Sequence, residues 1–221
     1  MQRVVEPELM DDARQVLAYA QADFSEPNSH FVELLKQHHG DRLKGSCLDL
    51  GCGPGDICFR LAKQFPGLYI TGVDGSAAML EYARQSQNKH DLIHRVAFEQ
   101  HRLPSDDLLK HHFDVITSNS LLHHLHTPRV LWQTIRQCGK AGGIIHVMDL
   151  YRPQSERRAA QIVETYAAEE PQVLKEDFYH SLLAAFSPAE IESQLQEAGL
   201  TGLTMELISD RHILISGVLE H

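Results

Sequence analysis

The sequence lacks three features that would assign it to large classes of protein. It has no run of lysine or arginine residues and its formal net charge is −10, which argues against a nucleic-acid partner, since that needs a basic surface. It has no apolar stretch of membrane-spanning length and no apolar signal core near its start, so no membrane partner is expected. Its four cysteines form no C-x-x-C pair, which favours free thiols in a reducing cytoplasm.

The composition is ordinary for a soluble globular protein. The chain has 221 residues, of which 43% are hydrophobic and 23% charged, enough for one good core and a small accessory lid. The last residues, Leu-Glu-His, could be the remnant of a vector-derived tag, so residues 219–221 are left out of the interpretation.

Glycines are concentrated at residues 47–55, in the segment Cys-Leu-Asp-Leu-Gly-Cys-Gly-Pro-Gly. A short apolar strand is expected to end at Leu50, and a helical apolar period begins after Asp56. Glycine suits the intervening turn because it adopts unusual dihedrals and lets a ligand approach the exposed N–H groups of the helix start. A tight turn without a ligand is the alternative.

Two cofactor classes compete for this turn. A dinucleotide-binding turn reads G-x-G-x-x-G/A, and its last small residue lets the helix pack on the strand. Counted from Gly51, that position is Asp56, which weakens the dinucleotide interpretation. A second apolar strand, from Tyr69 to Val73, ends at Asp74, 23 residues after Gly51. A carboxylate there suits the two hydroxyls of a ribose, and a plain turn or N-cap residue is the alternative.

The chain alternates between strand and helix periods from residue 46 onwards. Strands are expected at 46–50, 69–73, 96–100, 113–117 and 143–150, and helices at about 56–65, 77–87 and 128–138. This alternation predicts an α/β fold whose parallel sheet is covered on both faces and binds ligands beyond the carboxyl ends of its strands. A capping box at 187–190 predicts a helix start, and 202–208 and 212–218 predict a hairpin with an antiparallel last strand.

The spacing Asp-x-Gly-x-Gly-x-Gly at 49–55 resembles the first motif of the class I S-adenosylmethionine-dependent methyltransferases. Residues 73–80 and 118–128 are similar to two further motifs of that family. The resemblance, which runs from about Ser46 to Gly217, implies a Rossmann-like, doubly wound, seven-stranded sheet. That sheet would be mostly parallel with an antiparallel last strand, and an N-terminal helical lid would cover it. The implied cofactor is S-adenosyl-L-methionine, and the product is S-adenosyl-L-homocysteine.

The resemblance also implies which residues hold the cofactor. Asp74 would bind the ribose, Met79 would pack on the adenine, and Asn119 would border the methionine part. Many family members carry an acidic residue after the third strand that accepts the adenine amino group. Here His101 and Arg102 occupy that loop, so backbone groups or stacking on Arg102 would replace it. The implied cofactor-binding residues are Asp49, Gly51, Cys52, Gly53, Asp74, Gly75, Met79, His101, Arg102, Asn119 and Ser120.

Two adjacent histidines are the catalytic candidates. By the resemblance, His123 and His124 lie where the methyl acceptor would bind, and an imidazole can serve as a general base because its pKa lies near neutrality. The alternative is that one of them packs and hydrogen-bonds below the pocket. His123 and His126 could face the same way on a helical turn, but no Cys, Asp or Glu stands within a short spacing to complete a metal shell. We therefore predict no metal.

Helical additions flank the expected sheet. Residues 1–44 are expected to form an N-terminal helical cap, and 45–218 the methyltransferase domain, with a helical insertion at about 153–186. In the resembled family such additions often cover the active site, so they supply the acceptor-binding candidates. These are Met10, Tyr19, Phe24, Tyr151, Arg152 and Tyr179. Plain packing of the apolar residues and a surface ion pair for Arg152 are the alternatives.

The function that these residues and the resemblance favour is methyl transfer from S-adenosylmethionine to a small-molecule acceptor by direct in-line displacement. An NAD(P)-dependent oxidoreductase is a second hypothesis, against which Asp56 and the terminal hairpin count. A non-catalytic S-adenosylmethionine-binding protein is a third, because binding motifs do not guarantee chemistry. The expected partner is a small-molecule acceptor in the cytoplasm. The sequence identifies neither that acceptor nor an oligomeric state.

Overall fold

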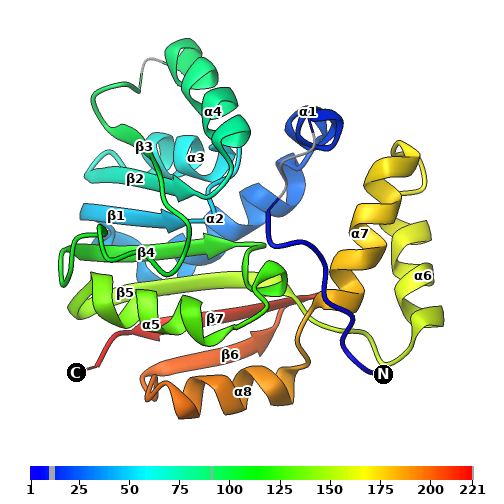
Figure 1. Cartoon of the computed structure of the whole chain (residues 1–221). Coiled ribbons are helices and arrows are strands. Elements are labelled where there is room, and N and C mark those ends of the chain that lie inside the picture. The colour runs from blue at the N-terminus through cyan, green and yellow to red at the C-terminus, as the bar shows by residue number, and fades with distance from the viewer. Residues whose placement is uncertain (10–12, 91, 221) are drawn as a thin grey trace.

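A seven-stranded sheet lies at the centre of the computed structural model, which describes residues 1–9, 13–90 and 92–220 (Figure 1). The strand order is β3-β2-β1-β4-β5-β7-β6. The strands are β1 Gly45–Leu50, β2 Leu68–Asp74, β3 Val96–Gln100, β4 Phe113–Asn119, β5 Gly139–Leu150, β6 Leu203–Leu207 and β7 His212–Val218. The helices and 3₁₀ turns are α1 Ala13–Gln21, α2 Ser25–His39, η1 Gly40–Arg42, α3 Asp56–Gln64, α4 Ala77–His90, η2 Leu122–His124, α5 Arg129–Cys138, α6 Glu156–Tyr166, α7 Gln172–Ala184 and α8 Pro188–Glu197.

The strand register brings the ends of the parallel strands to one edge. Leu50 at the end of β1 pairs with Val73 of β2 and with Ser118 of β4, and Asp74 pairs with Gln100 at the end of β3. Strand β5 continues the parallel set, whereas β7 runs antiparallel to both β5 and β6. The predicted mostly parallel sheet with an antiparallel last strand is therefore confirmed. The residues that follow β1, β2 and β4 meet at its carboxyl edge.

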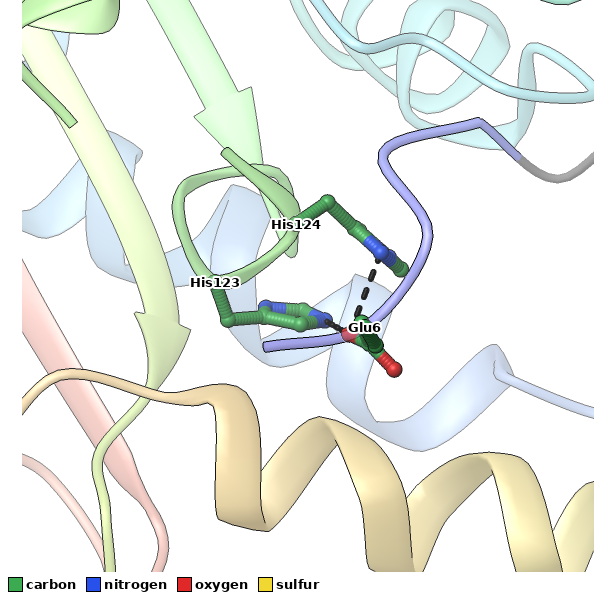
Figure 2. Close-up of side chains that lie close together, drawn as sticks. All are labelled: Glu6, His123 and His124. Atoms are coloured by element: carbon green, nitrogen blue, oxygen red, sulfur yellow. Dashed lines mark ion pairs between the residues drawn. The ribbon is translucent and has the colours of Figure 1, made fainter. Parts of the chain in front are cut away.

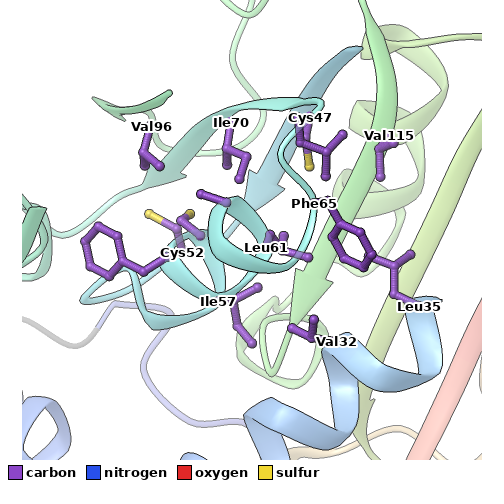
Figure 3. Packing of buried hydrophobic residues seen from close by; sticks show 14 of the residues in the cluster. Val32, Leu35, Cys47, Cys52, Ile57, Leu61, Phe65, Ile70, Val96 and Val115 are labelled. Atoms are coloured by element: carbon purple, nitrogen blue, oxygen red, sulfur yellow. The ribbon is translucent and has the colours of Figure 1, made fainter. Parts of the chain in front are cut away.

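Helices α2, α3 and α4 cover one face of the sheet (Figures 1 and 3). Leu35 of α2 and Leu61 of α3 are fully buried there against strand residues such as Cys47 and Val115. Each such burial stabilises the fold by about 1.5–3 kcal/mol. The four cysteines are all free and buried, which agrees with the expectation of free thiols.

Helices α5 and α8 cover the opposite face, where the single tryptophan lies. Trp132 of α5 is fully buried, and its Nε1–H donates to Oε1 of Gln194 in α8 at 2.9 Å. The hydrogen bond satisfies the one polar group of the indole and ties the two helices together. Leu219 also packs into this core, and its backbone N–H donates to Gly143.

Prolines lie at the starts of two helices. Helix α2 begins at Ser25, so Pro27 lies in its first turn, where a missing N–H breaks no helical hydrogen bond. Helix α7 begins at Gln172, directly after Pro171, and its first turn buries Leu174. The predicted capping box at the start of α8 is confirmed. None of the helices in the described ranges is long and apolar enough to cross a membrane.

A buried histidine pair lies between α2 and the sheet. The Oγ of Ser216 in β7 lies 2.9 Å from Nε2 of His39 and 3.1 Å from Nδ1 of His146, whose Nε2 lies 3.2 Å from the Phe31 carbonyl oxygen. Burial lowers the pKa of His146 to about 3 and the pKa of His39 to about 4. Both side chains are therefore neutral in the fold at neutral pH.

We expect the free energy of unfolding to fall as the pH drops from about 6.5 towards 4. In that window both histidines are protonated in the unfolded chain but not in the folded chain. Each histidine therefore lowers the free energy of unfolding by up to about 1.4 kcal/mol for every pH unit of acidification. Urea unfolding of the wild type and of His146→Gln across this range measures the slope. The free energy of unfolding of the variant should depend less steeply on pH, because one of the two histidines is gone. An unchanged slope would contradict the inference that His146 is neutral in the fold.

Candidate active site

Three adjoining cavities open at the carboxyl edge of the sheet, and Tyr19 and Asn119 line all of them. The strand-end cavity, of about 110 Å³, lies beside the ends of β1, β2 and β4. The glycine-loop cavity, of about 160 Å³, lies between the turn after β1 and the start of α2. The histidine cavity, of about 270 Å³, is lined by η2, α6 and α7.

All of the predicted cofactor-binding residues line two of these cavities. Asp49 and Cys52 line the glycine-loop cavity. The strand-end cavity is lined by Gly51, Gly53, Asp74, Gly75, Met79, His101, Arg102, Asn119 and Ser120. The fold thus brings residues from four separate loops to two cavities that share lining residues, although their roles towards a ligand stay a prediction.

The turn after β1 needs glycine for two different reasons. Gly51 has a φ of +72°, and a Cβ there would lie 2.9 Å from Cδ1 of Leu121, so neither the backbone nor the space admits a side chain. Gly53 has a φ of +51°, and a Cβ added there would have no protein atom within 4 Å, because the residue lines both the strand-end and the glycine-loop cavities. A methyl group at Gly53 would therefore meet open space that a ligand can occupy.

Asp74 joins the end of β2 to this turn. Its Oδ2 accepts the backbone N–H of Gly53 at 2.9 Å, and its Oδ1 accepts that of Ser76 at 2.8 Å. These two bonds fix the carboxylate at the wall of the strand-end cavity. Asp74 is thus held where the sequence predicts a ribose-binding carboxylate.

Asp49 lies deeper, at the floor of the glycine-loop cavity. It is 2% exposed and accepts hydrogen bonds from Oγ1 of Thr117 at 2.7 Å and from Sγ of Cys58 at 3.2 Å. Burial raises the pKa of Asp49 to about 6, partly offset by these two donors. A cationic ligand group in this cavity would favour the ionised carboxylate.

Replacing Gly53 with alanine is expected to weaken S-adenosylhomocysteine binding by about 10-fold or more, because the methyl group enters the space that the ligand needs. Gly142→Ala is the matched control, since Gly142 also has a positive φ of +74° and nothing within 4 Å of its Cβ position. Both variants should lose similar stability, but only Gly53→Ala should lose affinity. Equal affinities by calorimetry would remove Gly53 from the site.

The loop after β3 forms the outer wall of the strand-end cavity. Arg102 pairs with Glu8 at 3.3 Å, and the ring of His101 lies within hydrogen-bond distance of Ser105 and Glu99. Met79 of α4 is buried on the same side. The wall therefore offers a thioether, an imidazole and a guanidinium where the sequence predicts adenine binding.

His123 and His124 lie on the η2 turn, directly after β4, and line the histidine cavity. The Nδ1 of His123 lies 2.5 Å from Oδ1 of Asp149, at the end of β5. Asp149 also accepts the backbone N–H groups of Leu122 and Leu150. A buried carboxylate therefore orients the His123 ring, as in catalytic and metal-binding histidines.

The N-terminal segment, residues 3–8, lies across this turn (Figure 1). The guanidinium of Arg3 donates to the carbonyl oxygens of His123 and Leu125 at 2.8 and 3.0 Å. Glu6 follows, and its Oε1 lies 3.1 Å from Nδ1 of His124 and 3.6 Å from Nε2 of His123 (Figure 2). A carboxylate from the start of the chain thus reaches both histidines.

Burial and the carboxylates act in opposite directions on these groups. Burial alone would lower the pKa of His123, but Asp149 and Glu6 outweigh it, so that pKa lies above its usual range. Burial and, to a smaller extent, the neighbouring His123 together lower the pKa of His124 to about 3. Burial raises the pKa of Glu6. The two adjacent imidazoles are therefore electrostatically different.

The predicted acceptor-binding residues divide into two groups. Tyr19 and Phe24 line the histidine cavity with their ring centroids 4.7 Å apart, and burial raises the pKa of Tyr19 to about 12, so its hydroxyl is neutral. Met10 lies outside the described residues. The other three predicted residues do not line any of the three cavities, as far as the described residues show. They are Tyr151, Arg152 and Tyr179.

The structure places those three residues in other contacts. Tyr151 packs in the core, and its hydroxyl donates to the Ser209 carbonyl oxygen. Arg152 pairs with Glu190 at 2.8 Å, which is the ion-pair alternative. Tyr179 packs between α6 and α7, and its neighbour Phe178 lines the cavity instead. The helical period of α7 decides which of the two aromatic residues faces inward.

Sequence reasoning missed three residues of the site. Asp149 ends β5, and the rule that ligands bind at the carboxyl ends of parallel strands could have identified it. Glu6 lies in a segment without helical or strand periodicity, so no sequence signal points to it. Asn28 lines two cavities, and its Oδ1 accepts from Asn119 at 3.2 Å.

Comparison with known proteins gives one family and several relatives. The family model for a methyltransferase domain matches residues 48–145. A ubiquinone biosynthesis O-methyltransferase from Histophilus somni is 28% identical over 124 residues, which cover 55% of this chain and 51% of that protein. A demethylmenaquinone methyltransferase from Thermotoga maritima is 29% identical over 135 residues, 61% of this chain and 55% of that protein. The chain thus spans about half the length of these curated relatives.

The fold is shared with solved structures at lower sequence identity. The phosphoethanolamine N-methyltransferase 2 of Haemonchus contortus, solved in complex with S-adenosyl-L-methionine, aligns with a TM-score of 0.68. The identity is 16%, and the alignment covers 87% of this chain and 53% of that one. At this identity the likeness concerns the fold alone.

Proposed function

Because this chain belongs to the class I S-adenosylmethionine-dependent methyltransferases, we propose that it transfers the sulfonium methyl group to a small-molecule acceptor by in-line displacement. One observation carries the proposal. The glycine turn, Asp74 and Asn119 meet at the carboxyl edge of the sheet, where strand-end residues line two cavities that share Gly51, Gly53 and Asn119. This is the edge at which folds of this type bind ligands.

The residues that line these two cavities fit S-adenosylmethionine. Asp74 offers a fixed carboxylate to a pair of ribose hydroxyls, while Gly53 leaves its Cβ position open. The Oδ1 of Asn119 is buried and has no hydrogen-bond partner among the described residues. It can therefore accept a hydrogen bond from a ligand donor such as the ammonium group. Asp49 adds a carboxylate at the floor of the glycine-loop cavity. The donor groups of the cofactor thus match the acceptors of the site.

The chain's contribution to the reaction is mainly alignment. Bound S-adenosylmethionine supplies an electrophilic methyl group and a neutral thioether leaving group. Tyr19 and Asn119 line both the strand-end and the histidine cavities, so they would hold the acceptor against the methyl carbon and exclude water. Such alignment can supply several kcal/mol of barrier lowering, up to about 7–11. His123 or His124 would take a proton from an acceptor that binds in its protonated form.

A small molecule is the acceptor class that the cavity and the relatives favour. The histidine cavity is lined by Tyr19, Phe24, Tyr166 and Phe178, which suits a partly apolar acceptor. The curated relatives act, by their names, in ubiquinone biosynthesis and on demethylmenaquinone. The net charge of −10 disfavours a nucleic-acid acceptor.

The remaining parts of the proposal concern organisation and location. We assign residues 1–44 to a helical cap and 153–186 to a helical insertion, both of which contribute to the walls of the cavities. The four free thiols suit the reducing cytoplasm.

Calorimetric titration tests the proposal. S-adenosylmethionine and S-adenosylhomocysteine are expected to bind one site per chain, whereas NAD and NADP, as controls, are expected not to bind. Binding of the adenosyl ligands alone supports the assignment and justifies a screen of acceptors for methyl transfer. Binding of a nicotinamide dinucleotide, or of none of the four, would overturn it.

A further inference from the structure

We propose that Glu6, His123 and His124 form a binding site for a first-row divalent transition-metal ion such as Zn²⁺ or Fe²⁺. Each residue offers one ligand atom, and these atoms all lie within 4.8 Å of one another. Figure 2 shows the two imidazoles converging on the carboxylate from the same turn. The set of two histidines and one carboxylate leaves further coordination positions open, as in catalytic metal sites.

The separations of the ligand atoms suit an ion between them. The Oε1 of Glu6 lies 3.1 Å from Nδ1 of His124 and 3.6 Å from Nε2 of His123. Metal bonds of about 2.0–2.1 Å that meet at roughly 90–110° place two ligand atoms about 2.9–3.4 Å apart. The two imidazole nitrogens lie within 4.8 Å of each other, so the rings complete the site by rotating towards the carboxylate.

The carboxylate oxygen at the centre lacks a hydrogen-bond partner. Oε1 of Glu6 is buried and accepts no hydrogen bond from the described residues, whereas Oε2 is 3.3 Å from the Ser181 hydroxyl. A buried acceptor in this condition is costly unless a cation lies beside it. The unsatisfied atom is also the one that both imidazoles approach.

The surroundings orient both rings as metal-bound histidines are oriented. The Nδ1–H of His123 donates to Asp149 at 2.5 Å, which leaves the Nε2 lone pair directed at Glu6. Such a carboxylate–histidine–metal arrangement fixes the tautomer and the direction of a ligand. The ring of His124 is held by a hydrogen bond to the backbone of Pro7. Each ligand is therefore supported by a second contact.

The site lies on the wall of the histidine cavity, so an ion there would face the acceptor. Both histidines line that cavity, and His124 also lines the strand-end cavity. An acceptor oxygen or nitrogen would fill an open coordination position, which favours acceptors with metal-binding atoms next to the methylated one. An imidazole nitrogen bound to the ion has no free lone pair, so with the ion in place the ion, rather than His123 or His124, would assist the loss of a proton from the acceptor. This consequence rests on the proposed function, whereas the ion site itself does not.

The site is tested by measuring the affinity of the full chain for Zn²⁺. The protein is first freed of metal with a chelator, and Zn²⁺ is then titrated in the presence of a chromophoric chelator that competes for the ion. The wild type should bind one Zn²⁺ per chain tightly, and Glu6→Gln should bind it at least about 100-fold more weakly. Glu8→Gln is the matched control, because Glu8 and His126 form an exposed carboxylate–histidine pair on the same segments, 3.8 Å apart. It should bind Zn²⁺ like the wild type.

Two further measurements make the result decisive. Co²⁺ should give the visible absorption of a nitrogen-ligated site in the wild type and lose it in Glu6→Gln and in His124→Asn, so a folding defect of one variant does not decide the outcome. No tight ion in the wild type, or wild-type affinity in the folded variants, would overturn the proposal. S-adenosylhomocysteine calorimetry of the wild type runs in parallel. Zn²⁺ binding without adenosyl binding would overturn the proposed function and leave the ion site standing.

Discussion

Replacing Asp74 with alanine is expected to weaken S-adenosylhomocysteine binding by about 100-fold or more. The carboxylate would accept two charge-assisted hydrogen bonds from a ribose, each worth about 1.5–3 kcal/mol, and one factor of ten corresponds to about 1.4 kcal/mol. It also holds the backbone of Gly53 and Ser76 in place, so the variant loses preorganisation of the turn. Calorimetry with the purified variant measures the loss.

A conservative variant separates the two contributions at this position. Asp74→Asn keeps one oxygen that can accept the Gly53 N–H, but it loses the charge and one acceptor. We expect its affinity to lie between those of the wild type and the alanine variant. Wild-type affinity in Asp74→Ala would remove this residue from the ribose-binding role.

Replacing Asp149 with alanine is expected to lower the free energy of unfolding by about 3–5 kcal/mol. The side chain is 1% exposed and accepts the backbone N–H groups of Leu122 and Leu150 as well as Nδ1–H of His123. Its removal leaves these donors buried without an acceptor, and each such loss costs about 1–3 kcal/mol. Urea unfolding followed by circular dichroism measures the change.

Asp210→Ala is the control for this prediction. Asp210 pairs with Arg158 at 2.8 Å and Arg211 at 3.3 Å, but its side chain is 34% exposed, so water replaces the lost contacts. We expect a change of about 1 kcal/mol or less. Equal losses in the two variants would show that the buried network around Asp149 is not a source of stability.

The fold and the cofactor edge follow from local patterns. The glycine spacing after Leu50 sets the turn, because positive φ at Gly51 and Gly53 is accessible mainly to glycine. The apolar periods of the strands and helices are local too, and they predict a parallel sheet whose loops meet at one edge. Asp74 could be predicted because a strand end fixes its position relative to the turn.

The walls of the cavities could not be predicted in the same way. Tyr151 and Arg152 follow β5 at the correct edge, yet the chain turns there and directs them to Ser209 and Glu190. Phe178 rather than Tyr179 faces the cavity, because α7 packs on α6 in one particular rotation. An aromatic pair on a helix does not reveal its own orientation.

The sequence by itself determined the methyltransferase fold, the glycine turn and the carboxylate at the end of β2, because each depends on residues close together along the chain. Only the tertiary structure brought Glu6 to His123 and His124, and only the register of β5 against β4 brought Asp149 to the same turn. Spacing along the chain predicts no metal, because the third residue of the proposed ion site comes from the other end of the sequence. Contacts between distant segments carry no local signal, and the chemistry of the acceptor side depends on them.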